Sequence, residues 1–277
     1  VVNSNEVVPK QKDALGSRTV NIGIDGAAPG HVYDMSSLRL GLTLKLYNPA
    51  HAEGQAVTGH TVAPINYFAQ TIIKKVEIFF NDVCVYNSHN YYAQRALFDA
   101  WLNHNNADRE GTLRCQGFIP DEAAHVEDAT LASVGFRSRA HFFGQPTPVE
   151  PNAQDNHHVD FSATPRTFYV PLVTDLSTLD MHLISQVNVR VAIEFHDSSY
   201  VLWTAGAASG MNYELQIVSC NLRVKMLQMS EGYERSVESM LGKGPLKYRH
   251  KRIEPKPFTM PANQSTFSTS SITQTTT

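Results

Sequence analysis

The chain has 277 residues, enough for one large β domain or two small ones. Only 18% of the residues are charged, while 16 glycines and 14 prolines supply many turn-formers, a balance that favours an all-β protein with many loops. The formal net charge of −3 excludes a basic field over the whole surface, so composition gives no case for general binding of nucleic acid.

The cysteines are sparse and odd in number. Cys84, Cys115 and Cys220 form no CxxC pair, which argues against a disulfide framework. Cys84 and Cys220 fall in strand-like runs and are predicted to be buried small apolar residues. No apolar run approaches the ~20 residues that span a bilayer, and no signal-peptide pattern opens the chain. We therefore expect neither a membrane-spanning segment nor a signal peptide.

The first strands are predicted in the amino-terminal third. Residues 1–16 are polar and predict an arm. Arg18–Ile24 predicts the first strand. Leu38–Leu46 reads LRLGLTLKL, and leucine at every second position places five leucines on one face of a strand, whereas a helix would scatter them.

A hairpin is predicted next. Ile72–Phe80 and Val83–Tyr86 are rich in β-formers, and Asn81-Asp82 between them is a two-residue turn signal. The hairpin belongs to the stretch 64–104, which also contains a helix-period segment. Because no catalytic motif elsewhere in the sequence is as informative, this stretch points to a β-sheet assembly protein rather than to an enzyme.

A helix is predicted from Asn90 to Leu102. Its alanines, with Leu97 and Trp101, recur at three- and four-residue steps and predict a stripe that faces the protein interior. Ser88 or Asn90 is the expected cap of its first turn. We interpret the helix as a packing element at one edge of a sandwich.

The pattern weakens after residue 105 and returns near residue 166. Asp121–Ser133 predicts a short helix, and the prolines between 146 and 151 predict an extended loop. A bulge is expected near Ser219. Later strands are predicted at Arg166–Val173, Gln186–His196 and Tyr213–Leu227, followed by a helix at Glu231–Leu241 and a β run at Lys247–Met260.

These elements predict an all-β fold. About eight strands without βαβ alternation indicate an antiparallel sandwich or barrel, and the jelly roll is the eight-stranded sandwich of this kind. We therefore expect an antiparallel eight-stranded jelly-roll sandwich with an inserted helix and long loops.

No catalytic, cofactor or metal site is predicted. His157-His158, flanked by Asp155 and Asp160, is the best histidine cluster, but adjacent strand residues point to opposite faces and could hardly share a metal. Nucleophile-elbow, HExxH and phosphate-loop motifs are missing from the sequence. The stretch 242–245, GKGP, reads as a helix stop and a turn, because Pro245 lacks the N–H that a phosphate loop uses. We expect no enzyme and no cofactor.

Two charged clusters have a structural and a functional interpretation. The acidic residues Asp121, Glu122, Glu127 and Asp128 are predicted to form a solvated helix face rather than a general acid/base pair. A basic run lies within 243–256, and we favour an exposed linker strand over contact with nucleic acid or an acidic neighbouring subunit. No specific nucleic-acid site is predicted. The run comprises Lys243, Lys247, Arg249, His250, Lys251, Arg252 and Lys256.

Several segments resemble a known family. PINYF at 64–68, VEIFFNDVCV at 76–85 and YYAQRALFDAWLN at 91–103 resemble the first jelly roll of the major capsid proteins of Maverick/Polinton-like and adintovirus-like double-stranded DNA viruses. CNLRVKML at 220–227 resembles the last strand of that roll, and Tyr248–Met260 resembles the segment leading into the second. Asp99 stands where the family has Glu, and the loops between 105 and 165 match nothing in it.

The resemblance implies a division of the chain. It implies an N-terminal arm (1–16), a jelly roll (17–229), a linker helix (230–246) and a last segment (247–277), either the first strand of a second jelly roll or a C-terminal tail. The family's chain continues through a full second roll, whereas this one stops just after the second should begin.

The implied function is structural. We expect a homo-oligomeric capsid subunit, a trimer of pseudo-hexagonal outline that contacts neighbouring capsomers and minor capsid proteins. Such subunits build an icosahedral shell around a DNA genome, are located in the virion and are assembled inside the host cell. The alternatives are a single jelly-roll vertex protein (a penton or minor capsid protein) and a β-sandwich carbohydrate-binding or cupin-like protein, the last motivated by the histidines.

Overall fold

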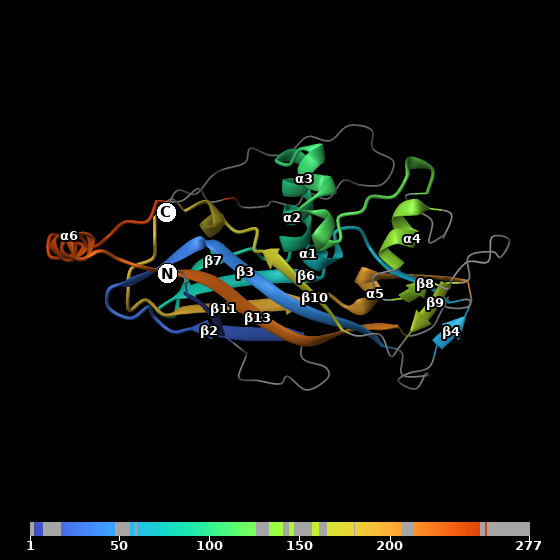
Figure 1. The fold of residues 1–277 in the computed structure, drawn as a ribbon, viewed down its shortest axis with the longest axis horizontal. Helices are drawn as coiled ribbons and strands as arrows, with labels where there is room; N and C mark the ends of the chain where they lie inside the picture. The colour runs from blue at the N-terminus through green and yellow to red at the C-terminus, as the bar shows by residue number, and fades with distance from the viewer. Residues whose placement is uncertain are drawn as a thin grey trace, which may run out of the picture.

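The computed structural model shows two four-stranded antiparallel sheets packed face to face (Figure 1). The face-to-face arrangement encloses one main hydrophobic core, to which both sheets contribute. The residues that the structure describes are 3–7, 18–47, 56–58, 60–125, 133–140, 144–146, 157–160, 165–179, 181–206, 213–249 and 253.

The two sheets draw on strands from the whole chain. The first sheet has the order β1 (Asn3–Val7), β13 (Glu214–Gln228), β3 (His31–Tyr47), β10 (Arg166–Pro171). The second sheet has the order β2 (Thr19–Ile24), β11 (Val189–Phe195), β6 (Ile73–Phe80), β7 (Val83–Asn87). All of their pairings are antiparallel.

The strand order defines the topology. Numbered along the chain, the eight main strands run 1-8-3-6 in one sheet and 2-7-4-5 in the other. The first strand thus pairs with the last, the second with the seventh, the third with the sixth and the fourth with the fifth, as in one long hairpin rolled into a sandwich. This is the jelly roll, and the predicted fold class is confirmed. Residues 3–7, expected within the arm, supply its first strand.

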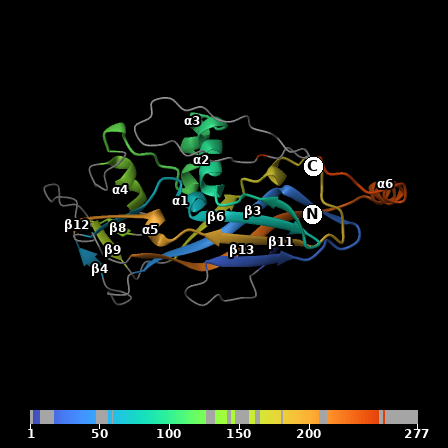
Figure 2. The same cartoon turned by 180° about the vertical axis from the view of Figure 1, so that it is seen from behind.

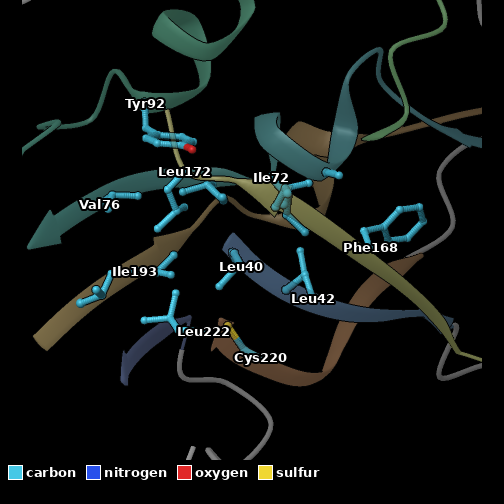
Figure 3. Close-up of a cluster of buried hydrophobic side chains, with 14 of the residues drawn as sticks. Leu40, Leu42, Ile72, Val76, Tyr92, Phe168, Leu172, Ile193, Cys220 and Leu222 are labelled. Carbon is cyan, nitrogen blue, oxygen red and sulfur yellow. The ribbon is translucent and has the colours of Figure 1, made fainter. Parts of the chain in front are cut away.

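The core is built from strands with a strict period of two. The five leucines of β3, from Leu38 to Leu46, are at most 4% exposed, and Val191 and Ile193 of β11 are fully buried. Figure 3 shows Leu40, Leu42, Ile193 and Leu222 pointing into the same core between the sheets. Because successive side chains of a strand point to opposite faces, one face of each strand fills this core.

The hairpin between β6 and β7 has the predicted turn. Asn81 and Asp82 have φ angles of 46° and 66°, the left-handed conformation that a two-residue type I′ turn requires at both positions. Asparagine and aspartate tolerate this region better than other non-glycine residues, which explains why they occupy the turn. The register shifts between Ile78 and Phe79, so β7 carries a bulge against β6.

Helix α2 (Tyr92–Leu102) follows the hairpin at the predicted place, but two details differ. Trp101 is 53% exposed and faces outward, so the prediction that it faces inward is wrong, while Leu97 is half-buried against the core. The inner face is built from small alanines with Tyr92, which lets the helix lie close to the sandwich. Neither Ser88 nor Asn90 caps the helix: Tyr91 stands at the N-cap without a side-chain bond, and Ser88 Oγ accepts from Val76 N instead.

Parts of three connections between strands gather at one end of the sandwich, whereas α2 lies over its middle (Figures 1 and 2). The β3–β6 connection contains β4 (Ala56–Thr58), β5 (His60–Pro64) and α1 (Phe68–Thr71). The β11–β13 connection contains α5 (Ser198–Val201) and β12 (Leu202–Gly206). The long β7–β10 connection contains α2, α3 (Asn106–Glu110), η1 (Arg114–Gln116), η2 (Ala123–His125), α4 (Val134–Ala140), β8 (Gly144–Pro146) and β9 (His157–Asp160).

The three connections join in two small sheets. Strand β12 pairs with β5, and β9 pairs with both β4 and β8. The helix predicted over Asp121–Ser133 is replaced by η2 and, beyond it, α4, with residues 126–132 outside the described part. The β10–β11 connection contains η3 (Asp175–Thr178), near the other end of the sandwich.

Helix α6 (Glu231–Leu241) has the predicted bounds and projects beyond the sandwich (Figure 1). It buries none of its residues. Of the predicted β run at 247–260, the structure describes 247–249 and 253, which are not in a strand, and the rest lies outside the described residues. None of the described helices has the length and apolar character needed to cross a membrane.

Candidate functional site

Histidine and acidic side chains are the groups that a metal site would need. Within the described ranges, no three His, Cys, Asp or Glu side chains are grouped so that they could hold a metal ion. His157 and His158 are consecutive residues of β9, and the His196 ring stacks on Tyr200 with the ring centroids 4.0 Å apart. His250 lies outside the described residues.

The two strand cysteines differ in exposure. Cys220 is 3% exposed, as predicted, and burial raises the pKa of its thiol to about 12. Cys84 is exposed, so the prediction that it is buried is wrong. The physical reason is the register shift in the edge strand β7, after which Cys84 pairs with Phe79 rather than with a core-facing residue.

A buried polar network joins the inserted helices to the sandwich. The Gln70 side chain is fully buried; its Nε2 donates to Pro171 O at 2.8 Å and to Gln116 Oε1 at 3.0 Å. The Tyr92 hydroxyl donates to Gln70 Oε1 at 2.9 Å and accepts from Val173 N at 3.0 Å. Buried polar groups must be hydrogen-bonded, so this network fixes α1, α2 and η1 against the end of β10.

A second network ties four parts of the chain to one carboxylate. Asp175 Oδ1 accepts from Arg95 Nη2 at 2.6 Å, and Arg95 Nη1 donates to the Tyr86 hydroxyl at 3.1 Å. Asp175 Oδ2 accepts from the backbone N–H of Ile253 at 3.2 Å. The Asp175 side chain is 3% exposed. It therefore joins α2, β7 and η3 to the segment that follows α6.

This second network predicts a loss of stability at alkaline pH. Burial raises the pKa of Tyr86 from 10.0 to about 12, although the Arg95 guanidinium acts in the opposite direction. The pKa in the folded state lies above that in the unfolded chain, so the stabilisation is fully present below pH 10 and is lost as the pH rises through 12. We expect Tyr86→Phe to make the fall in melting temperature between pH 9 and pH 12 shallower, measured by circular dichroism.

The control for this prediction is Tyr233→Phe. Tyr233 is 50% exposed on α6, so its removal should leave the alkaline slope as in the parent protein. An equal change of slope in the two variants would contradict the assignment to Tyr86.

A buried ion pair holds the α4 insertion. Arg139 is 1% exposed, and its Nη2 lies 2.8 Å from Asp121 Oδ2. Its Nε donates to Pro64 O at 2.8 Å and its Nη1 to Ile119 O at 2.5 Å. Asp121 was predicted on a solvated face, and that prediction is wrong because Arg139 covers its carboxylate. Nothing in the sequence separates Arg139 from Arg137; only the packing of α4 on β5 does.

Helix α2 exposes three large apolar side chains on one face. Phe98, Trp101 and Leu102 of α2 are 65%, 53% and 80% exposed, at positions i, i+3 and i+4. The guanidinium of Arg109 lies over the Trp101 ring, 5.8 Å from its centroid. The Trp101 ring also meets Phe118 edge-on, with the ring centroids 6.4 Å apart. The opposite face of α2 is packed on the sandwich, so within the described residues Phe98 and Leu102 are the more open part of a second apolar face.

The basic run is only partly described. Lys243, Lys247 and Arg249 are exposed, as predicted, but they do not form the predicted linker strand. The other members, from His250 to Arg252 and Lys256, lie outside the described residues.

Comparison with known proteins gives matches of fold. No protein-family model matches the sequence, and no curated protein matches it. A chain in a cryo-electron microscopy structure of the Sputnik virophage aligns with a TM-score of 0.53 at 10% identity, covering 83% of this chain and 48% of that one. The Faustovirus major capsid protein aligns with a TM-score of 0.46 at 11% identity, covering 87% of this chain and 56% of that one.

These alignments concern the fold. The Sputnik chain is similar in overall fold, at a sequence identity too low to compare individual residues. The chain spans about half the length of the structures that it matches. The class that fold and surface define is therefore a jelly-roll protein with large insertions at one end of the sandwich.

Proposed function

We propose that this protein is a structural subunit of a viral capsid. The observation that carries the proposal is the 1-8-3-6 and 2-7-4-5 strand order, which the chain shares as a fold with a chain of the Sputnik virophage. The resemblance of 64–68, 76–85 and 91–103 to the capsid proteins of Maverick/Polinton-like and adintovirus-like viruses supports the same function. A jelly roll suits it, because its compact sandwich limits the strand edges that would otherwise pair without control.

We further propose a double jelly-roll subunit, of which this chain contains the first roll. The support is the half coverage of the matched structures and the resemblance of Tyr248–Met260 to the segment that leads into a second roll. In this proposal residues 17–229, together with the strand at Asn3–Val7, form the roll, and residues 230–246 form the linker. Three such subunits make a capsomer of pseudo-hexagonal outline in an icosahedral shell around DNA, with neighbouring capsomers and minor capsid proteins as partners.

The test of this function is the assembly state. Light scattering on the purified chain, followed by electron microscopy, is expected to show trimers. Electron microscopy of the virion, assembled in the host cell, is expected to show hexagonal capsomers. Pentamers would support the vertex protein instead. A protein that stays monomeric at all concentrations and associates with no particle would contradict both.

The exposed apolar residues of α2 provide a sharper test. Leu102 is 80% exposed, so Leu102→Glu should leave the melting temperature within about 2 °C of the parent. If copies of the chain meet at this face, Leu102→Glu should lower the association constant of the trimer on the order of tenfold or more. The reason is that a carboxylate buried without a partner is costly.

The matched control is Val218→Glu on β13. Val218 is 54% exposed and lies on another face of the sandwich. Loss of the trimer in both variants, or in neither, would show that α2 is not the contact.

A further inference from the structure

His196, which follows strand β11 directly, has an enclosed ring nitrogen. Its Nε2 is closed off from solvent and has no hydrogen-bond partner among the described residues. The ring stacks on Tyr200, with the centroids 4.0 Å apart and the planes inclined by 20°. A neutral ring can leave this nitrogen as a bare acceptor, whereas a protonated ring carries hydrogen on both nitrogens. Protonation would therefore bury an N–H bond without an acceptor, which is costly.

The main chain of His196 is held on both sides. Its N–H donates to Ile72 O at 2.8 Å, just before β6, and its carbonyl accepts from Arg18 Nη1 at 2.5 Å, just before β2. Two neighbouring strands of the second sheet thus fix the position of the residue. A protonated ring can escape its surroundings only by turning its side chain away from Tyr200.

The charged groups around the ring are already paired. Lys74 of β6 lies 2.5 Å from Glu194 of β11, Nζ to Oε1, and Arg18 Nη1 lies 3.0 Å from Asp197 Oδ1. An imidazolium would be a third cation beside two carboxylates that each have a cation. Nearby opposite charge therefore compensates little of the cost of burial.

These surroundings favour the neutral ring in the folded protein. Burial lowers the pKa of His196 from its ordinary value of 6.5, and the Lys74 ammonium lowers it further, whereas Asp197 and Glu194 act in the opposite direction. The pKa in the folded state lies below that in the unfolded chain. The stabilisation by the neutral ring is thus fully present above pH 6.5 and is lost as the pH falls through the lowered pKa.

The ring stacks on a turn that joins other parts of the fold. Tyr200 belongs to α5, whose Ser198 and Val201 are buried. Val201 O accepts from Ile65 N at 2.8 Å, which joins α5 to the β3–β6 connection. Ser198 Oγ accepts from Leu215 N at 2.9 Å, which joins α5 to β13. A displacement of α5 would loosen both links at the end of the sandwich where the connections gather.

We propose that His196 is a pH switch that holds α5 in place only while its ring is neutral. In acid the protonated ring turns away from Tyr200 into solvent, and α5 loses the packing that holds its bonds to Ile65 and Leu215. The core between the two sheets does not depend on this ring, so acid loosens one end of a sandwich that stays folded. The switch belongs to the fold itself and holds for a monomer as well as for a capsid subunit.

Melting temperatures of the full 277-residue chain test the proposal. Unperturbed carboxyl groups titrate at about pH 4, so the interval between pH 7 and pH 5 reports mainly on histidines. His196→Phe keeps a flat ring for stacking but cannot take up a proton. Between pH 7 and pH 5 the melting temperature of the parent should fall by about 2–4 °C more than that of His196→Phe.

The control for this test is His182→Phe. His182 is exposed, so this variant should keep the slope of the parent. Equal slopes in the parent and in His196→Phe would overturn the proposal.

Hydrogen exchange shows whether the effect is local. In the parent at pH 5.5, the amides of Ile65, Tyr200 and Leu215 should lose about three- to tenfold in protection relative to pH 7.5, after correction for intrinsic rates. The amide of Val191, in the middle of β11, should keep its protection, and His196→Phe should show no loss at any of the four. A loss spread evenly over both sheets would refute the switch, because the whole fold would then be affected.

A further variant changes the surroundings of the ring and leaves the ring itself intact. Lys74→Met removes the facing cation and makes Glu194 available to an imidazolium. The fall in melting temperature should become shallower than in the parent, and the His196 ring, followed by NMR of ¹⁵N-labelled histidine, should titrate at higher pH. Lys75→Met is the matched control, because Lys75 pairs with Glu77 instead, 2.9 Å away. An unchanged titration in Lys74→Met, or a His196 ring that titrates above 6.5 in the parent, would contradict the proposal.

Discussion

Replacing Arg139 with methionine is expected to lower the free energy of unfolding by about 3–5 kcal/mol. The guanidinium is 1% exposed, and its removal leaves Asp121 as a largely buried carboxylate without its cation. The backbone carbonyls of Pro64 and Ile119 lose their donors at the same time. Urea titration followed by tryptophan fluorescence measures the change, and Trp203, which packs against the α4 cluster, reports on this region.

Arg235→Met is the matched control for this prediction. Arg235 lies on α6, and its side chain is 80% exposed beside Glu231, which is 90% exposed, so its loss should change stability by no more than about 0.5 kcal/mol. The double variant Arg139→Met with Asp121→Asn should recover part of the loss, because the buried charge is then removed. A single variant as stable as the parent would show that α4 is held by its apolar contacts alone.

Leu42→Ala is expected to cost about 2–5 kcal/mol in the free energy of unfolding. Leu42 is fully buried and stands in register with Phe168 of β10 and Cys220 of β13 (Figure 3). Truncation removes its dispersion contacts and leaves a cavity between two sheets that relax little. Urea titration of the purified protein measures the loss.

Two controls separate the cavity from the loss of a leucine as such. Leu42→Met keeps the volume and should cost less than about 1.5 kcal/mol. Val218→Ala removes apolar atoms from an exposed position of β13 and should stay within about 0.5 kcal/mol. If all three variants lost the same stability, the central position of Leu42 in the core would be disproved.

Local chemistry made much of the fold predictable. The alternating leucines of β3 face the core as predicted, and the Asn81-Asp82 turn adopts the backbone that these residues favour. The bulge expected near Ser219 is present as a register shift between Ile217 and Ser219. Each of these features depends on neighbours within a few residues, so a single sequence contains the whole signal.

The surface and the buried polar groups were less predictable. Trp101 sits in a helical apolar pattern, and only the position of α2 on the sandwich decides that alanines and Tyr92 face inward. Cys84 has the neighbours of a buried strand residue but lies on an edge strand. In the sequence, Asp121 does not differ from the other acidic residues near it. In the structure, Arg139 of α4 covers its carboxylate.

The sequence alone determines where apolar and polar residues alternate along a strand, where the chain turns and that a helix ends at Gly242. These three features depend on the period of the side chains and on backbone preference. Only the tertiary structure decides that strand 1 meets strand 8, that three insertions gather at one end, and that Asp175 joins α2 to Ile253. Those contacts join residues up to more than 200 positions apart, as between Asn3 and Met226. The stabilisation that these contacts provide comes from burial, which exists only once both partners are in place. No local sequence pattern therefore predicts them.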